Sequence, residues 1–307
     1  NKVVHSLSDI VFIAFFAHLA NCDGWTEIHL FSLRYETSLK RILPLENGLP
    51  SKDTIRRVIQ TIHPSIFEEL NTQWNELLRE NQPQPFSNFV AIDGKTMCGN
   101  QEKYTRASHI VTAYSVEEGL CLGQTAVAEK SNEITAIPKL INGLALAGQT
   151  ITIDAMGTQR EIAKQIRRKE ADYVLAVKGN QGILHEEISE YLEDKQVEKQ
   201  IKATVGGYIQ TIDSAHGQIE KREYYQTDEI SWMNEKQKWT GIQTIGKVVT
   251  TIEKGKKRTK ETRYYISSCP MDSQHFQKAV RGHWMIESMH WHLDVTFRED
   301  SNHTLNK

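Results

Sequence analysis

The stretch SNFVAIDGKT, residues 87–96, places an acidic side chain directly after an apolar run. Its apolar residues, Phe89 to Ile92, are typical of a buried strand, and Asp93 follows at the expected end of that strand. Asp-Gly after a strand most often forms a turn. In open α/β sheets the carboxyl ends of strands are also where ligands bind. The stretch therefore predicts a strand and leaves two roles open for Asp93, turn former or ligand.

A second strand is predicted to end in the same way. Ile151 and Ile153 alternate along ITIDAMG, and Asp154 follows them as Asp93 follows its own strand. Two such strands in one sheet would place both aspartates at one edge, close together. Carboxylates that close repel each other, and a divalent cation such as Mg²⁺, which prefers oxygen ligands, relieves the repulsion. The pair therefore predicts a metal site.

The segment RGHWMIESMHWHLDVTFRED, residues 281–300, offers a third acid. His283, Glu287, His290 and Asp294 are spaced to lie on one face of a helix, and Glu287 is the natural third ligand. A di-iron site would need a second Glu-x-x-His element, and a zinc protease would need H-E-x-x-H, which is absent. A plain polar helix face with satisfied histidines remains open.

The N-terminal part of the chain has helical periodicity. Ser51 is placed to cap SKDTIRRVIQTI, and Ser8 or Asp9 to cap the first apolar run. The stretch ENQPQPFSN, residues 80–88, contains two prolines and is typical of a linker. We therefore expect a small helical domain over residues 1–82.

From residue 88 the apolar period becomes that of strands alternating with helices. The expected strands are 88–93, 108–116, 120–128, 149–154 and 172–179, and the expected helices are 133–146 and 158–169. This order predicts the α/β class, with a mixed sheet that carries helices on its faces. Further strand-like runs between about residues 205 and 267 look like an insertion before a final helical segment that starts near Asp272.

The composition indicates a soluble globular protein. Of the 307 residues, 39% are hydrophobic and 25% are charged, which suffices for one large domain or two. The longest apolar stretch, Ile10 to Ala20, is interrupted by His18 and is shorter than the roughly 20 residues that a membrane span needs. The four cysteines are scattered without a C-x-x-C pair, and no export signal is visible. We therefore expect a cytoplasmic protein with reduced thiols and no membrane partner.

The formal net charge of −2 gives no global signature of nucleic-acid binding. If DNA is the partner, the basic charge must be local, and the chain has three basic clusters. They are Lys40, Arg41, Lys52, Arg56 and Arg57; Arg160, Lys164, Arg167, Arg168 and Lys169; and EKGKKRTKETR at 253–263. For any one cluster alone, a solvated face or a hairpin tip is the favoured interpretation.

Several ordered motifs carry a family resemblance. They are AIDGKT, EKSNEITAIPKL, TIDAMG, DYVLAVKGNQ, SAHGQIEKRE, RYYISS and HWMIESMHWHLDVTFRED. In this order they resemble the H-repeat-associated (ISAs-type) proteins, a group of bacterial insertion-sequence transposases of DDE type. The resemblance extends to LSDIVFIAFFAHLANCDGW and NGLPSKDTIRRVI in the N-terminal part, and thus covers nearly the whole chain.

The resemblance implies a ribonuclease-H-like catalytic domain over residues 83–307, with a β-rich insertion at about 182–270. It implies the triad Asp93, Asp154 and Glu287, which would bind two Mg²⁺ or Mn²⁺ ions. Such paired ions activate a water or a 3′-hydroxyl on one side of a phosphodiester and stabilise the leaving oxygen on the other. The implied partner is double-stranded DNA, at transposon ends and target, and proteins of this type generally act as homodimers on paired ends.

Side chains near these acids are candidates for DNA contacts. The expected DNA-binding residues are Lys95, Lys178, Asn180, Gln181, His283, Trp284 and His290. The lysines and amides suit phosphates or flanking bases. Trp284 and Trp291 suit stacking on a distorted base, although a tryptophan in an amphipathic helix is more often part of the core.

The chain departs from the family pattern at two places. Met97, Cys98, Gly99 and Asn100 follow the first motif where relatives usually have basic residues, and His303 and Leu305 stand where relatives tend to carry arginines. Weakened phosphate contacts would lower DNA affinity. Two alternatives to an active transposase therefore stay open: a decayed or repurposed DNA-binding remnant, and a ribonuclease-H-like nuclease that acts on structure rather than sequence.

Overall fold

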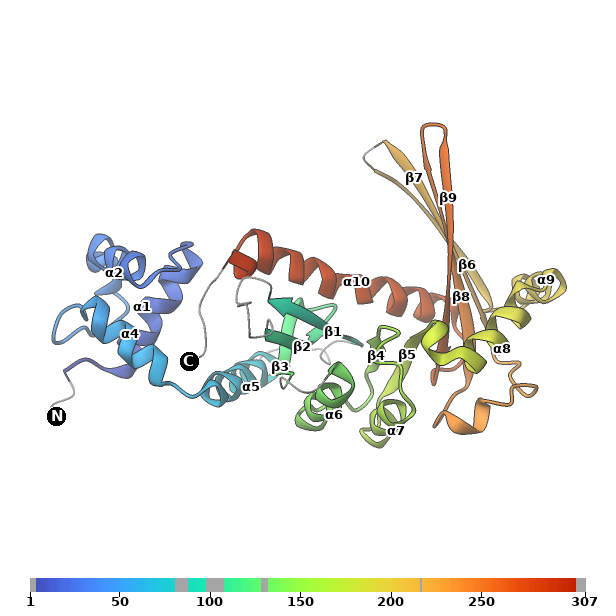
Figure 1. Ribbon diagram of the computed structural model, residues 1–307, viewed down its shortest axis with the longest axis horizontal. Helices are drawn as coiled ribbons and strands as arrows, with labels where there is room; N and C mark the ends of the chain where they lie inside the picture. Colours follow the sequence, from blue (N-terminus) through green and yellow to red (C-terminus); the bar gives the residue numbers. More distant parts are fainter. Residues whose placement is uncertain (1–3, 81–87, 98–107, 128–131, 216, 302–307) are drawn as a thin grey trace.

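A computed structural model of the chain describes residues 4–80, 88–97, 108–127, 132–215 and 217–301. Figure 1 shows an elongated molecule with N-terminal helices at one end and long hairpins at the other. Residues 81–87 of the expected linker, the positions Cys98 to Asn100, and His303 and Leu305 lie outside the described residues. None of the described helices combines the length and the apolar character that crossing a membrane requires.

Helices make up the described N-terminal part. They are α1 (Leu7–Leu19), α2 (Trp25–Arg34), α3 (Glu36–Leu39), α4 (Lys52–Thr61) and α5 (Pro64–Glu80). Ser51 caps α4 as predicted, because its hydroxyl accepts a hydrogen bond from the Thr54 N–H. The cap of α1 was misplaced by the sequence pattern. Ser6 fills it and accepts from the Asp9 N–H, so Ser8 and Asp9 lie inside the first turn.

The N-terminal helices have their own small core and a separate connection to the sheet. Ile10, Ile13, Ile28 and Ile55 pack together in that core. Helix α5 leads to the sheet, where the Asn75 side chain donates to the backbone carbonyl of Cys121 at 3.0 Å.

A single mixed sheet contains all nine described strands. They are β1 (Phe89–Met97), β2 (Ser108–Ser115), β3 (Leu120–Ala126), β4 (Thr150–Ile153), β5 (Asp172–Val177), β6 (Tyr208–Ala215), β7 (Gln218–Thr227), β8 (Thr244–Lys254) and β9 (Lys257–Ser267). Their spatial order is β3-β2-β1-β4-β5-β9-β8-β7-β6. Strands β1, β4 and β5 run parallel, and the other neighbours pair antiparallel. The mixed α/β class predicted from the sequence is therefore confirmed.

Two details of the sheet differ from the sequence prediction. Strand β1 does not end at Asp93, because β2 pairs with it from Val90 through Met97. The Asp-Gly pair consequently lies within a strand and forms no turn. The stretch from residue 182 also begins with helices, α8 (Gly182–Glu193) and α9 (Lys195–Ala203), before β6 to β9 extend the same sheet through the pairing of β9 with β5.

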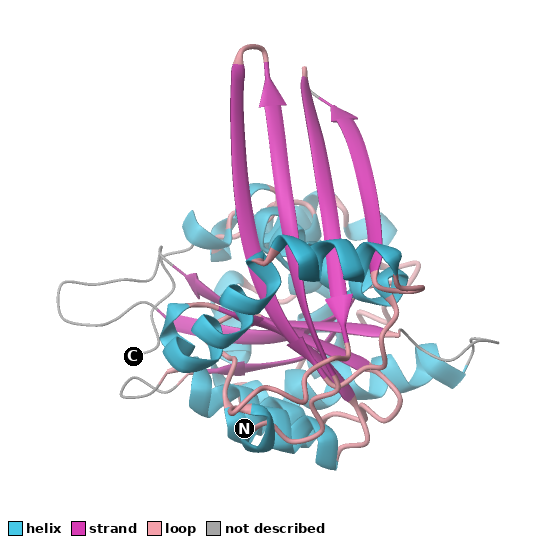
Figure 2. Ribbon diagram, turned by 90° about the vertical axis from the view of Figure 1, so that its right-hand side faces the viewer, coloured by secondary structure: helices cyan, strands magenta, loops and turns pink. Residues whose placement is uncertain are grey.

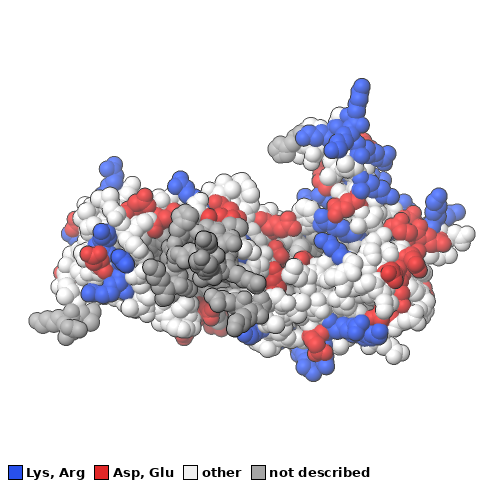
Figure 3. Space-filling model, in the orientation of Figure 1, with Lys and Arg blue, Asp and Glu red and all other residues white. Residues whose placement is uncertain are grey.

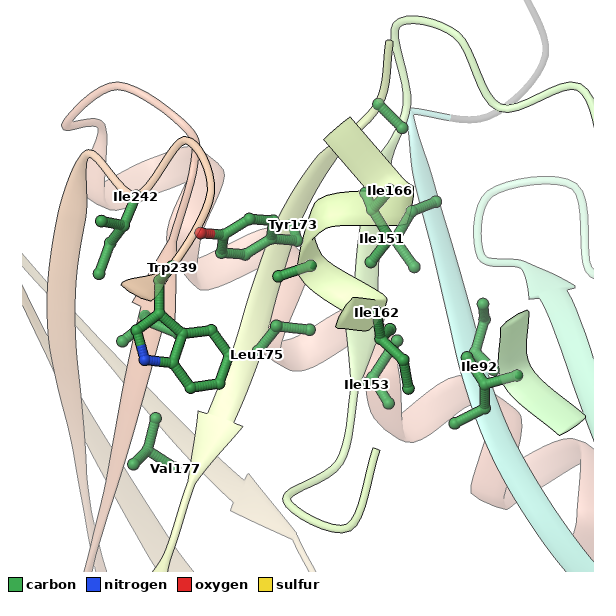
Figure 4. Close-up of a cluster of buried hydrophobic side chains, with 14 of the residues drawn as sticks. Ile92, Ile151, Ile153, Ile162, Ile166, Tyr173, Leu175, Val177, Trp239 and Ile242 are labelled. Carbon is green, nitrogen blue, oxygen red and sulfur yellow. The ribbon is translucent and has the colours of Figure 1, made fainter. Parts of the chain in front are cut away.

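Helices cover both faces of the sheet. On one face lie α8, α6 (Glu133–Gly143) and α7 (Arg160–Arg168); α10 (Ser273–Val295) crosses the other face. Ile92, Ile151 and Ile153 point to the first face, where they meet Ile162 of α7 in the main core (Figure 4). Side chains alternate along a strand, so Ala91, which packs on Ile286 of α10, marks the second face.

The substitution Gly246→Ala tests how closely α10 packs on the sheet. A Cβ at Gly246 would lie 2.8 Å from Phe276 Cζ and 2.8 Å from the carbonyl oxygen of Tyr225. Because the backbone oxygen cannot move without disturbing β7, we expect a loss of about 1–3 kcal/mol in the free energy of unfolding, measured in urea. The control is Gly143→Ala in α6, where nothing lies within 4 Å of the new Cβ. Equal losses in both variants would contradict this packing.

Candidate active site

Two aspartates occupy equivalent positions on neighbouring parallel strands. The register pairs Ile92 of β1 with Ile153 of β4, and β4 ends there. Asp93 and Asp154 each follow in the chain, and paired strands lie about 4.8 Å apart. Both aspartates belong to the alternation that faces α10, since Ala91 in β1 contacts that helix and Thr152 in β4 bonds to it.

Helix α10 is fixed over these strands by two histidine contacts. His275 Nε2 lies 3.0 Å from Thr150 Oγ1, and His283 Nδ1 lies 3.0 Å from Thr152 Oγ1. Both threonines are buried in β4. Glu287 follows His283 by one helical turn and therefore lies on the same side of α10. The histidines of α10 thus hold this helix against β4, the strand that precedes Asp154.

The three predicted acids line one cavity of about 230 Å³. It lies between Asp93 within β1, the carboxyl ends of β4 and β5, and one face of α10. Among its lining side chains are Asp93, Asp154, Glu287, Lys178, Arg263, His283 and Trp284. The three acids selected from the sequence therefore lie around the same cavity.

Asp93 is the most perturbed acid of this cavity. Burial raises its pKa to about 7, the Gly94 backbone N–H partly opposes the rise, and the charges of Asp154, Glu133 and Glu287 add to it. Its side chain is 22% exposed. The region thus carries an excess of negative charge that a cation would relieve.

Asp154 performs the turn function that Asp-Gly first suggested for Asp93. Its Oδ1 accepts hydrogen bonds from the N–H groups of Met156, at 3.0 Å, and Gly157, at 3.1 Å. These bonds fix the loop after β4 and the orientation of the carboxylate. They leave the second oxygen for another partner.

The donor set fits a divalent cation, although the acids do not converge in this conformation. Among the described residues, no three His, Cys, Asp or Glu side chains are close enough together to hold a metal ion. Carboxylate oxygens are nevertheless the ligands that Mg²⁺ prefers, and a bound cation would offset the burial and the neighbouring acids that together raise the pKa of Asp93. Glu287 lines the cavity, but its side chain is exposed to solvent.

The predicted DNA-binding residues near β5 have two different environments. Lys178 and Trp284 line the cavity. The side-chain amides of Asn180 and Gln181 instead donate to the carbonyls of Ala155, at 2.6 Å, and Thr158, at 2.8 Å. Those bonds hold the loop that follows Asp154. DNA contact by any of the four stays a prediction.

The two predicted histidines lie inside the site. His283 lines the cavity, and burial lowers its pKa to about 4. His290 Nδ1 lies 3.7 Å from Asp93 Oδ2, and burial together with the nearby Lys95 lowers the pKa of His290. Both rings are therefore neutral near pH 7. As DNA contacts they stay predictions.

Lys95 is held by acids of the C-terminal segment. Its amino group lies 2.6 Å from Asp294 Oδ1 and 3.1 Å from Glu299 Oε2, and its side chain is only 9% exposed. Burial would lower the pKa of Lys95, but these two partners outweigh it and raise the pKa. A phosphate contact by Lys95 would require these ion pairs to open.

Three cavity neighbours were not assigned a site role from the sequence. Arg263 lines the cavity with its guanidinium 5.0 Å from the Trp284 ring centre. Glu133 is bonded to His109 Nε2 at 2.6 Å, and a Cβ on Gly94 would collide with both groups. Glu133 lies in the quoted motif EKSNEITAIPKL, whereas only tertiary contacts identify His109.

Comparison with known families finds two family models that match the chain. Residues 84–307 match the family model described as the transposase DDE domain, and residues 1–75 match one described as DDE_Tnp_1-associated. The chain belongs to the DDE transposase family. Transposases act on DNA, and DDE domains generally use divalent metal ions.

Relatives of this DDE transposase carry transposase names. YncI of Escherichia coli O157:H7 is 40% identical over 98% of this chain and 77% of its own length. YhhI of Escherichia coli K12, named as H repeat-associated, is 36% identical over 97% of this chain and 79% of its own length. A solved simian T-cell lymphotropic virus intasome aligns at 14% identity and a TM-score of 0.24, over 59% of this chain and 63% of that one, which is too weak to support any argument.

The variant Asp93→Asn should stabilise the metal-free protein at neutral and alkaline pH. The folded-state pKa of Asp93, about 7, lies above the ordinary value near 4. The charged carboxylate therefore costs stability above pH 7, and this cost disappears as the pH falls toward about 4, because the folded state takes up the proton first. We expect a gain in unfolding free energy of roughly 2–4 kcal/mol at about pH 8 and almost none near pH 4.

Chemical denaturation in a chelator across this pH range measures the difference between wild type and variant. The control Glu46→Gln removes an exposed carboxylate and should stay within about 0.5 kcal/mol of wild type throughout. A pH-independent difference for Asp93→Asn would contradict the environment described for this carboxyl group.

Proposed function

We propose that this DDE transposase cuts and joins DNA at insertion-sequence ends, with Asp93, Asp154 and Glu287 as its catalytic acids. The observation that carries the proposal is the shared cavity of all three, with the two aspartates at equivalent positions of the parallel pair β1 and β4. Ligand sites at the carboxyl ends of strands are the rule in open α/β sheets.

The catalytic domain is proposed to be ribonuclease-H-like. The support comes from its central strands, in which an antiparallel β3-β2-β1 meander continues into the parallel pair β4 and β5. Helix α7 connects β4 to β5 as a crossover. The proposed domain boundaries remain 1–82 and 83–307, with the insertion at about 182–270.

Two bound Mg²⁺ or Mn²⁺ ions would supply an activated water or 3′-hydroxyl and charge compensation at the leaving oxygen. Asp93 and Asp154 would hold them from the two strands. Glu287 would complete the ligand set from α10, where its exposed side chain has room to turn. Because Asp154 Oδ1 is already committed to the Met156 and Gly157 N–H groups, its other oxygen is the one free for a metal.

The chain's own cations would hold the substrate around these acids. Lys178 and Arg263 line the cavity and suit the phosphates that flank a scissile bond. Trp284, 37% exposed, offers a face for a distorted base. The remaining proposed DNA contacts are Lys95, Asn180, Gln181, His283 and His290. Action as a homodimer on paired ends is part of the same proposal.

The substitution Asp93→Asn should abolish Mg²⁺- or Mn²⁺-dependent cleavage of the element's own ends, since it removes one metal ligand while keeping the shape. DNA binding in a chelator should change little. Mn²⁺ should raise the melting temperature of wild type and have much less effect on the variant, because a ligand stabilises the state that binds it. The control Asn142→Asp alters an amide on α6, outside the cavity, and should leave cleavage intact. Full metal-dependent activity of Asp93→Asn would overturn the catalytic role.

The alternatives give different results in the same assay. The first alternative is a decayed DNA-binding remnant of a transposase, and the observation in its favour is that the three acids do not converge on a metal site among the described residues. Such a remnant would bind the ends without any metal-dependent cleavage. A ribonuclease-H-like nuclease would cleave unrelated duplexes or branched DNA as well as the terminal repeats. We expect cleavage to require the terminal repeats, measured with matched duplexes of scrambled sequence.

A further inference from the structure

We propose that the hairpin formed by β8 and β9 is a DNA-binding arm, which holds the backbone of duplex DNA beside the catalytic cavity. The inference rests on the proposed function and adds to it a surface outside the cavity. The hairpin spans Thr244 to Ser267, and Figure 2 shows it projecting from the body of the sheet next to the β6–β7 hairpin.

Positive charge gathers at the free end of this hairpin. Its basic tip consists of Lys254, Lys256, Lys257, Arg258 and Lys260, all of which are exposed. Figure 3 shows Lys and Arg side chains crowded at the outermost part of the projection. The chain as a whole has a net charge of −2, so this concentration is local and does not follow from the overall composition.

The tip charges are largely uncompensated. Arg258 lies 3.4 Å from Glu253, but both side chains are more than half exposed, so the pair is weak. Within the described parts of the chain, no carboxylate forms an ion pair with any of the four lysines. Lys254 and Lys257 are also direct cross-strand partners, an arrangement that destabilises a hairpin by like-charge repulsion. A polyanion would relieve that repulsion.

The neighbouring hairpin provides a contrast within the same molecule. Near its end, Asp213 and Glu220 are cross-strand partners, and Arg222 makes ion pairs with both of them. Its charges are therefore compensated within the chain. The β6–β7 hairpin thus projects into solvent with paired charges, so exposure to solvent alone does not explain the unpaired lysines of the basic tip.

Edge protection is the other physical reason for lysines on a hairpin. Strand β9 pairs with β5 through Tyr264 to Ser267, so on that side no described strand pairs with it from Lys257 to Arg263. Lysines on such an edge discourage aggregation. This reason applies less to Lys254, which pairs with Lys257 at the end of β8, a strand that lies between β7 and β9, and it does not extend to Lys256, which lies in the turn. Charge of either sign would protect the edge, whereas only positive charge binds phosphate.

The arm is continuous with the catalytic cavity. At its base Arg263 lines the cavity and stacks on Trp284. From Arg263 to Lys257 the strand rises about 3.3 Å per residue, or roughly 20 Å in all. Because the rise of duplex DNA is about 3.4 Å per base pair, a duplex lying along the arm would meet the basic tip about six base pairs from the cavity.

The test compares two variants of the full chain with equal changes in charge. Lys256→Glu/Lys257→Glu reverses charge at the tip but keeps the β9 edge charged. Lys195→Glu/Lys199→Glu reverses two exposed lysines of α9, and those lysines have no ion pair among the described residues. Binding of a labelled duplex that spans the arm is measured by fluorescence anisotropy in a chelator, over a series of KCl concentrations.

We expect the tip variant to bind at least roughly tenfold more weakly at low salt, and the slope of log affinity against log salt to fall by about 2, since each phosphate contact contributes about 0.9. The α9 variant should change neither quantity by a comparable amount. Equal losses in both variants, or none in the tip variant, would overturn the proposal. Aggregation or a changed oligomeric state of the tip variant alone would also overturn it, in favour of edge protection or of an acidic protein partner.

Cleavage measurements separate this inference from the proposed function. On a duplex too short to reach the tip, the variant should cleave like wild type in Mn²⁺, while on a long duplex its KM should rise with little change in kcat. If the wild-type protein cleaves no duplex, the proposed function is refuted. The anisotropy measurement would still test DNA binding by the arm, because it is made in a chelator. Normal cleavage with unchanged KM on the long duplex would refute the arm alone.

Discussion

The alternation of side chains along β1 and β4 is the constraint on which the site depends. In both strands the residues that face α6 and α7 are large and apolar, as in the pair Ile92 and Ile153. The opposite residues must face α10, and in β4 these include Thr150 and Thr152, each bonded to a histidine of that helix. A shift of one residue in either strand would move its aspartate to the apolar face, where a charged carboxylate is far more costly.

The aspartates were predictable because their signals are local. An apolar run that ends in Ile-Asp needs only the strand period to be recognised, and the parallel pairing then brings Asp93 and Asp154 together. Glu287 was predictable to a similar extent, since helical spacing alone puts it one turn from His283. The interpretation of Asp93 as the end of its strand was wrong because that end depends on β2, which joins from a distant part of the sequence.

Other features of the site depend on contacts that a motif does not reveal. Asn180 and Gln181 sit in a recognisable motif, but their amides bond to the loop after β4. Their identity can therefore be explained by loop geometry as well as by DNA. Lys95 follows Asp93 by two residues, yet its ion pairs come from Asp294 and Glu299, about two hundred residues later in the chain. The single sheet was also beyond local patterns, because it requires β9 to return to β5 after two helices and three strands.

The proposed DNA-binding arm and the proposed catalytic acids lie in regions of opposite charge. A phosphodiester that approaches Asp93, Asp154 and Glu287 meets three acids, and without cations this cavity repels DNA. Lys178 and Arg263 offset only part of this repulsion, so the proposed affinity in the absence of metal draws on positive charge that lies far enough away to be screened from those acids. At physiological ionic strength that distance is about 8 Å, and the basic tip lies well beyond it, roughly 20 Å along β9 from Arg263. Under the proposed function, a chain with nearly balanced charge can thus bind a polyanion at the arm while the acidic cavity keeps its place for cations.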